Sequence, residues 1–108
     1  MRRKNSLTSV EFMTFKATRR INGRFFTLLI GPAFADRLKY ACVVSKKVAR
    51  KAVSRNLIKR RCREAIRGEH TEGAKPRSLV FYAKSSATEA SFADVREDVK
   101  SLLSSAKS

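Results

Sequence analysis

The alternation of apolar and polar residues predicts three β-strands in this 108-residue chain. Residues 24–31 and 37–44 are rich in β-forming side chains and are separated by a turn with glycine and proline, which predicts a hairpin. Residues 78–83 are apolar almost throughout, as in a strand that is covered on both faces. The pattern therefore predicts a small sheet whose third strand is central.

Three helices are predicted around these strands. Thr8 and Glu11 have the spacing of a capping box, which starts a short helix over residues 9–17. A second helix covers residues 52–67, before Gly68. Ser91 begins a third helix. Its core face is predicted from the helical period and carries Phe92, Val95, Val99, Leu102 and Leu103.

The element order α-β-β-α-β-α defines an α+β protein, with helices expected on one side of the sheet. The length fits one domain, residues 1–108. The polar ends, residues 1–6 and 105–108, are predicted to be flexible.

Charge changes this picture, because 25 Lys and Arg stand against nine Asp and Glu, for a net charge of +16. Self-repulsion of this size weakens the compact state, which indicates a polyanionic partner such as nucleic acid or an anionic membrane. There is no apolar stretch of ~20 residues and no signal-peptide pattern, so a cytoplasmic protein is expected. Cys42 and Cys62 fit no metal-binding spacing and are expected to be reduced, packed thiols.

Positive charge is concentrated in residues 45–67, which hold ten Lys or Arg and a single acid, Glu64. A solvated helix would interleave Glu with Lys, so this segment is expected to contact phosphates. Arginine grips phosphate through a planar fork, and Asn56 can both donate to and accept from a base or a 2′-hydroxyl. A ridge is predicted at steps of four residues: Arg55, Lys59, Arg63 and Arg67.

Three classes of protein with a basic helix compete at this point. A DNA-binding helix module is disfavoured by the predicted strands, and a membrane-active protein by the lack of an apolar helix face with aromatic anchors. An RNA-binding protein fits best, and composition alone does not separate a structural protein of the ribosomal type from a subunit of an RNA-processing complex.

The sequence predicts no catalytic residues in the protein itself. Hydrolysis of RNA by side chains would need clustered carboxylates for Mg²⁺ or a paired general acid and base. The single histidine, His70, stands in a polar loop. Asp94, Glu97 and Asp98 are predicted to form an exposed, salt-bridged face of the last helix.

Residues 44–67, VSKKVARKAVSRNLIKRRCREAIR, resemble the signature of the bacterial ribonuclease P protein subunit. The signature has a Ser-Lys-Lys opening, a basic spacer, and then Arg-Asn-Arg-Ile-Lys-Arg. Phe12 and the segments GRFFTLLI, LVFYAK and FADVREDVKSLL occupy the family's other positions, so the resemblance covers nearly the whole chain. Leu57 departs from the third residue of the Arg-Asn-Arg triplet, and Lys16 stands where the family has an apolar residue.

The resemblance implies a small α/β sandwich like a ribosomal protein domain, with a left-handed crossover around the signature helix. It implies a subunit of an endoribonuclease that removes the 5′ leader from precursor tRNA. Catalysis then resides in the RNA subunit, with Mg²⁺ held mainly by that RNA and the substrate. A monomer in a one-to-one complex with the RNA is expected, without a DNA or membrane partner.

The resemblance also assigns roles to particular residues. The leader-binding cleft would contain Phe12, Lys16, Thr27 and Leu29, while Phe26, Leu28 and Ile30 face the core. From the residues alone, Phe12 fits equally well as a core residue that packs beside the helix cap. The expected contacts to the catalytic RNA are Lys46, Lys47, Arg50, Lys51, Arg55, Asn56, Lys59, Arg60, Arg63 and Arg67.

Overall fold

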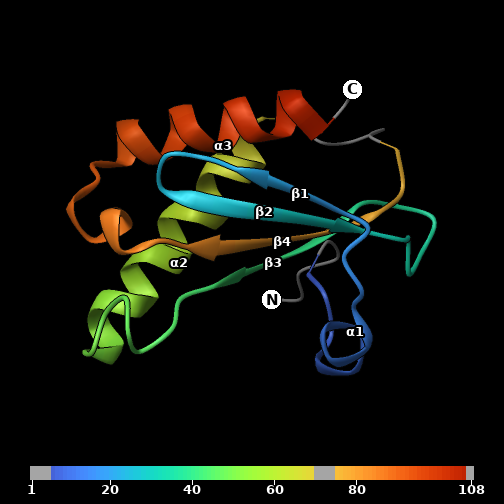
Figure 1. Cartoon of the computed structure of the whole chain (residues 1–108), viewed down its shortest axis with the longest axis horizontal. Coiled ribbons are helices and arrows are strands. Elements are labelled where there is room, and N and C mark those ends of the chain that lie inside the picture. Colours follow the sequence, from blue (N-terminus) through green and yellow to red (C-terminus); the bar gives the residue numbers. More distant parts are fainter. Residues whose placement is uncertain (1–5, 70–74, 107–108) are drawn as a thin grey trace.

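Four strands form one mixed sheet with three helices around it in the computed structural model, which describes residues 6–69 and 75–106. The strand order is β1-β2-β4-β3, and β3 and β4 are the parallel pair. Helices α2 and α3 cover one face, and α1 lies on the other, so the expectation of helices on one side only is wrong for α1 (Figure 1). The elements are α1 (Ser9–Thr14), β1 (Arg19–Asn22), β2 (Phe26–Gly31), β3 (Lys39–Val43), α2 (Ala52–Gly68), β4 (Ser78–Ala83), the 3₁₀ turn η1 (Ser85–Glu89) and α3 (Phe92–Ala106).

The α+β class and the central position of β4 are confirmed, but the predicted hairpin is wrong. Strand β2 pairs in antiparallel fashion with β1 and β4, and β3 pairs with β4 alone. Strand β4 lies inside the sheet because its first four residues are all buried. Strand β3 therefore lies at an edge. Strand β1 was not predicted, since Arg-Arg-Ile-Asn has only one apolar residue to mark it.

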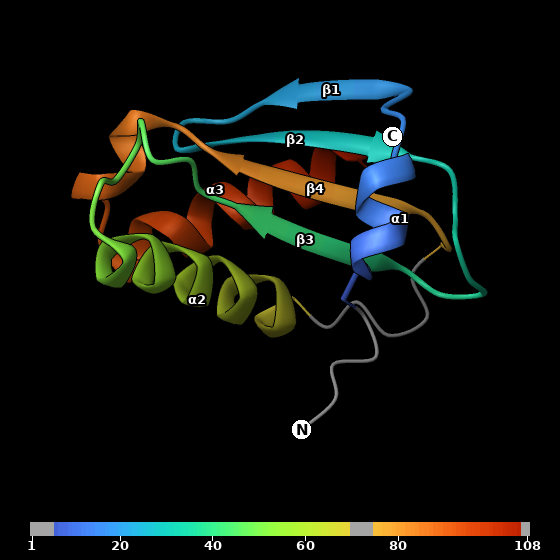
Figure 2. The ribbon, with the colours of Figure 1, turned by 90° about the horizontal axis from the view of Figure 1, so that it is seen from below.

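The connection from β3 through α2 to β4 is left-handed, as the resemblance implies (Figure 2). Parallel strands are joined in the right-handed sense in about 98% of cases, so this feature is rare. The helix still packs on α3 and on the same face of the sheet. As a result, α2 lies beside the edge strand β3, and the side of the helix that is turned away from the core is exposed to solvent (Figure 2).

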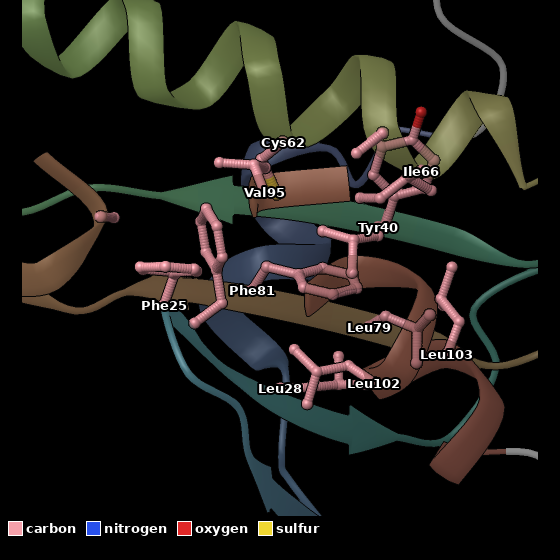
Figure 3. Close-up of a cluster of buried hydrophobic side chains, with 14 of the residues drawn as sticks. Phe25, Leu28, Tyr40, Cys62, Ile66, Leu79, Phe81, Val95, Leu102 and Leu103 are labelled. Carbon is pink, nitrogen blue, oxygen red and sulfur yellow. The ribbon is translucent and has the colours of Figure 1, made fainter. Parts of the chain in front are cut away.

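The hydrophobic core fills the space between the sheet and helices α2 and α3 (Figure 3). Phe26, Leu28 and Ile30 all belong to it, which confirms the predicted alternation along β2. Strand β4 adds Phe81, which is fully buried. The helices add Ile58, Cys62, Ala65 and Ile66 from α2, and Val95, Val99, Leu102 and Leu103 from α3.

Asp98 is buried and caps the β1–β2 turn, so its prediction as an exposed residue is wrong. Its carboxylate accepts backbone N–H bonds from Arg24 (2.8 Å), Phe25 (2.8 Å) and Phe26 (3.0 Å). A Cβ at Gly23 would lie 2.8 Å from the same carboxylate, which excludes a side chain there. Buried backbone N–H groups need acceptors, and the last helix supplies one to a turn 72–74 residues earlier in the chain.

Both ends of the described chain are tied to the fold. The Arg19 guanidinium donates to the carbonyl of Ser105 (3.0 Å), and that of Arg77 donates to the carbonyl of Ala106 (2.7 Å). These bonds satisfy the last carbonyls of α3, where a cation is also favoured by the helix dipole. Ser6 forms a parallel bridge with Tyr40. The rest of the segments predicted to be flexible, residues 1–5 and 107–108, lie outside the described residues.

Candidate nucleic-acid interface

Helix α1 starts as predicted and ends three residues earlier. The Glu11 backbone N–H donates to Thr8 Oγ1 (3.1 Å), and the Thr8 backbone N–H donates to Glu11 Oε1 (3.0 Å), which completes the capping box. The helix ends at Thr14 because Phe15 adopts an extended conformation. The Thr18 N–H then donates to the carbonyl of Ile30 (2.7 Å), and the chain continues as an extended segment towards β1.

Glu11 also attaches α1 to the sheet through an ion pair with Lys39 of β3. Lys39 Nζ lies 2.8 Å from Oε1 and 3.0 Å from Oε2 of Glu11, and the side chains of Lys39 and Glu11 are 10% and 20% exposed. The Lys39 ammonium, followed by the Thr8 backbone N–H, lowers the pKa of the Glu11 carboxyl below its ordinary value of 4.5. The same carboxylate therefore starts the helix and docks it.

Gly31 lets α1 and the segment after it approach the sheet closely. A Cβ at Gly31 would lie 2.7 Å from the ring of Phe15 and 2.7 Å from the carbonyl oxygen of Lys16. Gly31, Ser78 and Lys39 are neighbours across the three strands, and so α1 covers this row. Phe15 thus packs on the sheet rather than standing free in a cleft.

The rest of this face forms two rows of side chains, which we call the open rows. The first row is Arg20, Leu29, Val80 and Ala41, and the second is Asn22, Thr27, Tyr82 and Val43. Val80 is fully buried, whereas the other members of the two rows are partly or fully exposed. Leu29 and Thr27 are half-buried and lie outside the core cluster, as predicted for residues that face a cleft. Helix α1 lies beside these rows, on the same face (Figure 2).

Tyr82 is a candidate that sequence reasoning missed. It is 36% exposed, in the middle of the second open row and opposite Thr27. Its neighbour Phe81 is fully buried, so strand alternation alone would have placed Tyr82 on the outer face. The apolar run around it suggested a strand covered on both faces instead. An exposed aromatic ring on a sheet is a surface on which a base can stack.

Phe12 and Lys16 remain available at the edge of α1. Phe12 is 37% exposed and lies outside the core cluster. This exposure fits a residue of the cleft better than a residue of the core. Lys16 is exposed, and its side chain has no ion pair among the described residues. Whether these two side chains contact the leader stays a prediction.

Helix α2 divides into a buried face and two unlike flanks. Arg61 donates to the carbonyl of Ala90, just before α3, at 3.1 Å, so its flank faces α3. Leu57 stands one turn before Arg61, on the same side of the helix. The departure from the family signature at Leu57 therefore lies on the α3 side of α2 and not on its other flank. Burial raises the pKa of Tyr40 on β3, and the positive charges of Arg67 and Arg63 oppose this rise, which is consistent with their position on the β3 side of α2.

We call the β3 side of α2 the basic flank. Helical spacing of 100° per residue puts five of the predicted RNA contacts on it. They are Asn56, Lys59, Arg60, Arg63 and Arg67. Arg60 is mostly exposed and lies 3.8 Å from Glu64, a distance typical of a weak surface pair.

Arg55 differs from the rest of the predicted ridge. Its guanidinium donates to the carbonyls of Ala49 (3.0 Å) and Arg50 (2.7 Å), so it holds the loop before α2. That loop, residues 45–51, carries exposed Lys46, Lys47, Arg50 and Lys51. It leaves the end of β3 that is distant from α1, beside the second open row (Figure 2). The loop therefore connects the basic flank with the open rows.

Charge is distributed unevenly over the fold. Residues 85–106, which form η1 and α3, contain four acids and two bases, although the whole chain carries +16. The surplus of positive charge therefore lies away from α3. An anionic polymer would be attracted to the loop, the basic flank and β1 rather than to the α3 side.

The described residues offer few features of other functional classes. Within residues 6–69 and 75–106, no three His, Cys, Asp or Glu residues gather as metal ligands. In the same part of the chain, no helix is long and apolar enough to cross a membrane. His70 and Glu72 lie outside the described residues.

Solved structures share this fold. The ribonuclease P protein of Staphylococcus aureus is 22% identical, with a TM-score of 0.82 and 97% of each chain covered. The ribonuclease P protein of Thermotoga maritima is 28% identical, with a TM-score of 0.68, over 85% of this chain and 84% of that chain. The fold is therefore that of the ribonuclease P proteins.

Sequence comparison agrees with the fold. The family model for ribonuclease P matches residues 1–107. The ribonuclease P protein component of Azoarcus sp. (strain BH72) is 36% identical over 93 residues, covering 85% of this chain and 77% of the relative. That of Thermus scotoductus is 40% identical over 88 residues, and the match spans about half of its length (51%). The chain belongs to the ribonuclease P protein family, the protein components of a tRNA-processing endoribonuclease.

Proposed function

We propose that this protein is the protein subunit of ribonuclease P, and that it binds both the catalytic RNA and the single-stranded 5′ leader of precursor tRNA. The observation that carries the proposal is the continuity of three surfaces around β3. Strand β3, which carries Ala41 and Val43 of the open rows, is followed along the chain by the loop of residues 45–51 and by α2, and α2 lies beside β3 (Figure 2). A folded RNA and a single strand can therefore be held at the same time.

The two RNA partners need different chemistry. A folded RNA presents phosphates and 2′-hydroxyls, which suit Lys59, Arg63 and Arg67, with Asn56 as a donor and acceptor. A single strand presents unpaired bases, which suit the Tyr82 ring and the aliphatic Leu29. Mg²⁺ supplies activation of the attacking water and neutralisation of phosphate in this reaction, and we assign it mainly to the RNA and the substrate.

The side chains of this protein act by binding and positioning in this proposal. Neutralising phosphates between the catalytic RNA and the substrate lowers their mutual repulsion, so less Mg²⁺ is needed for assembly. Holding the leader on the sheet raises affinity for precursor tRNA over mature tRNA, which lacks the leader. The complex is expected to act in the cytoplasm, with one protein bound per RNA.

A cleavage assay tests the proposal. The protein is mixed with a bacterial ribonuclease P RNA and a 5′-extended precursor tRNA at low Mg²⁺, beside protein alone and RNA alone. We expect cleavage at the mature 5′ end when both are present. Tight RNA binding without stimulated cleavage would favour a structural RNA-binding protein of the ribosomal type. Cleavage by the protein alone would show an active site in the chain itself.

A further inference from the structure

The two cysteines, which are 20 residues apart in sequence, meet between β3 and α2. The sulfur atoms of Cys42 and Cys62 lie 3.0 Å apart, and both are free thiols. Cys62 is fully buried, on the side of α2 that faces the sheet (Figure 3). Cys42 is half-buried, on the edge strand β3. The chain has no other cysteine.

We propose that Cys42 and Cys62 form a dithiol site that is oxidised by low-molecular-weight disulfides to a reversible cross-link between β3 and α2. The separation of the sulfur atoms is shorter than an ordinary contact between two thiols, so a small movement is enough to bring them to bonding distance. Neither sulfur lies beside the described ion pairs, and neither belongs to the basic flank. The sulfur pair lies between β3 and α2, while the loop that it would close carries predicted RNA contacts.

Accessibility sets the order of the two steps. The Cys42 thiolate, at the sheet edge, attacks one sulfur of the small disulfide, which forms a mixed disulfide and releases the first small thiolate. Cys62 then attacks the Cys42 sulfur, which forms the cross-link and releases the second small thiolate. The two thiol protons end on the two released thiolates, and two electrons pass from the protein to the reagent.

Burial shapes the behaviour of the second thiol. It raises the pKa of the Cys62 thiol above its ordinary value, and the hydrogen bond with Cys42 raises it further. Burial therefore protects Cys62 from an outside reagent. The raised pKa leaves little Cys62 thiolate, and the 3.0 Å contact with Cys42 is what allows this small fraction to attack the mixed disulfide. This arrangement favours a cross-link within one molecule over a mixed disulfide that persists or a dimer.

The cross-link would stabilise the free protein at α2, the helix that carries more Lys and Arg than any other element. It closes a loop that runs from β3 through the basic loop to the middle of α2. Closing a loop of this length restricts the unfolded chain, and a rise in Tm on the order of 10 °C is expected. Reduction returns the protein to its original Tm.

The test is an equilibrium in glutathione redox buffers, followed by acid quenching, alkylation and intact-mass analysis. The wild-type protein is expected to lose two hydrogen atoms and to resist alkylation at both sites. The ratio of oxidised to reduced protein at a given buffer should be at least tenfold higher under native conditions than in urea. Cys42→Ser and Cys62→Ala should give no internal cross-link.

Other outcomes overturn the proposal. A persistent mixed disulfide at Cys42, a disulfide-linked dimer, or alkylation of both thiols at every redox ratio would each do so. Because Cys62 is fully buried, Cys62→Ala can lower stability by itself, and circular dichroism of each variant shows whether it folds. The comparison of native and urea-unfolded wild-type protein needs no variant, and its result is independent of RNA binding or cleavage.

Discussion

Glu11 on α1 and Lys39 on β3 form an ion pair of 2.8 Å that joins the first helix to the far edge of the sheet. The same carboxylate accepts the N–H of the N-cap residue Thr8. Formation of the helix and its docking therefore depend on a single side chain. Since α1 borders the open rows, this pair also fixes one wall of the proposed leader-binding surface.

We expect the docking of α1 to be lost in acid. The folded-state pKa of Glu11 lies below 4.5, so the ionised carboxylate stabilises the docked helix fully above about pH 4.5. This stabilisation is lost as the pH falls through the lower, folded-state pKa. Hydrogen exchange of the Thr18 amide, which bonds to Ile30 beside α1, reports the change.

Glu11→Gln should give fast exchange at this amide at all pH values, because Lys39 keeps its charge without a carboxylate partner. Glu97→Gln, which neutralises an exposed acid on α3, is the matched control and should keep the wild-type acid transition. An unchanged transition in Glu11→Gln would mean that the ion pair does not hold the helix.

Tyr82 is predicted to stack on a leader base. Tyr82→Ala should weaken binding of precursor tRNA by about 1–3 kcal/mol and leave mature tRNA almost unaffected, whereas Tyr82→Phe keeps the ring and should bind normally. Equilibrium binding to the assembled complex measures this. Phe34→Ala is a suitable control, because Phe34 is equally exposed (37%) but lies in the loop after β2. Equal losses for both tRNAs would exclude a leader contact.

Phe12→Ala is predicted to have the same selectivity as Tyr82→Ala. Both rings are about one third exposed and lie on the α1 face of the sheet. If one strand of RNA contacts both, the double variant should lose more selectivity for precursor tRNA than either single variant. Loss of folding in Phe12→Ala, seen by circular dichroism, would instead favour the core reading of this residue.

Reversal of charge on the basic flank is expected to weaken RNA binding. Lys59→Glu with Arg63→Glu removes two proposed phosphate contacts and adds two repulsive charges. The slope of log affinity against log salt should become shallower by roughly 0.7–0.9 for each lost contact. Arg96→Glu with Lys100→Glu makes the same change of charge on α3 and is the control. Equal effects of the two pairs would show that only net charge matters.

Asp98 is predicted to be a large contributor to stability. Asp98→Ala leaves the buried N–H groups of Phe25 and Phe26 without their acceptor, which should lower the free energy of unfolding by about 3 kcal/mol or more. Urea denaturation followed by circular dichroism measures this loss. Glu97→Ala, at an exposed position next to Asp98, should change stability by less than about 0.5 kcal/mol. Similar values for the two variants would contradict the buried cap.

Local patterns in the sequence predicted where the helices and strands lie better than they predicted which strands pair. The capping box at Thr8, the helix start at Ser91 and the apolar run of β4 are short-range signals, and each was found where predicted. Strand β1 has one apolar residue in four, and it is held by pairing with β2 and by Arg19 at the end of α3. Such contacts over long sequence distances leave no local pattern.

The same limit applies to the candidate site. Helical spacing grouped Arg55 with Lys59 and Arg63, but its guanidinium folds back onto loop carbonyls, which depends on the path of that loop. Asp98 stands three residues after Val95 and four before Leu102, so helical spacing places it on the core face, and its charge alone favoured the exposed prediction. Its role as an acceptor depends on the position of the β1–β2 turn. The roles of these residues follow from distant neighbours, which spacing does not encode.

The order β1-β2-β4-β3 leaves two strand edges where another chain could add. The outer edge of β3 is partly occupied, since Ser6 bridges to Tyr40 and the Leu7 N–H donates to its carbonyl. The outer edge of β1 is short and begins with Arg19 and Arg20, which would meet the same charges on a second copy. The sheet is therefore protected against edge-to-edge aggregation by its own residues.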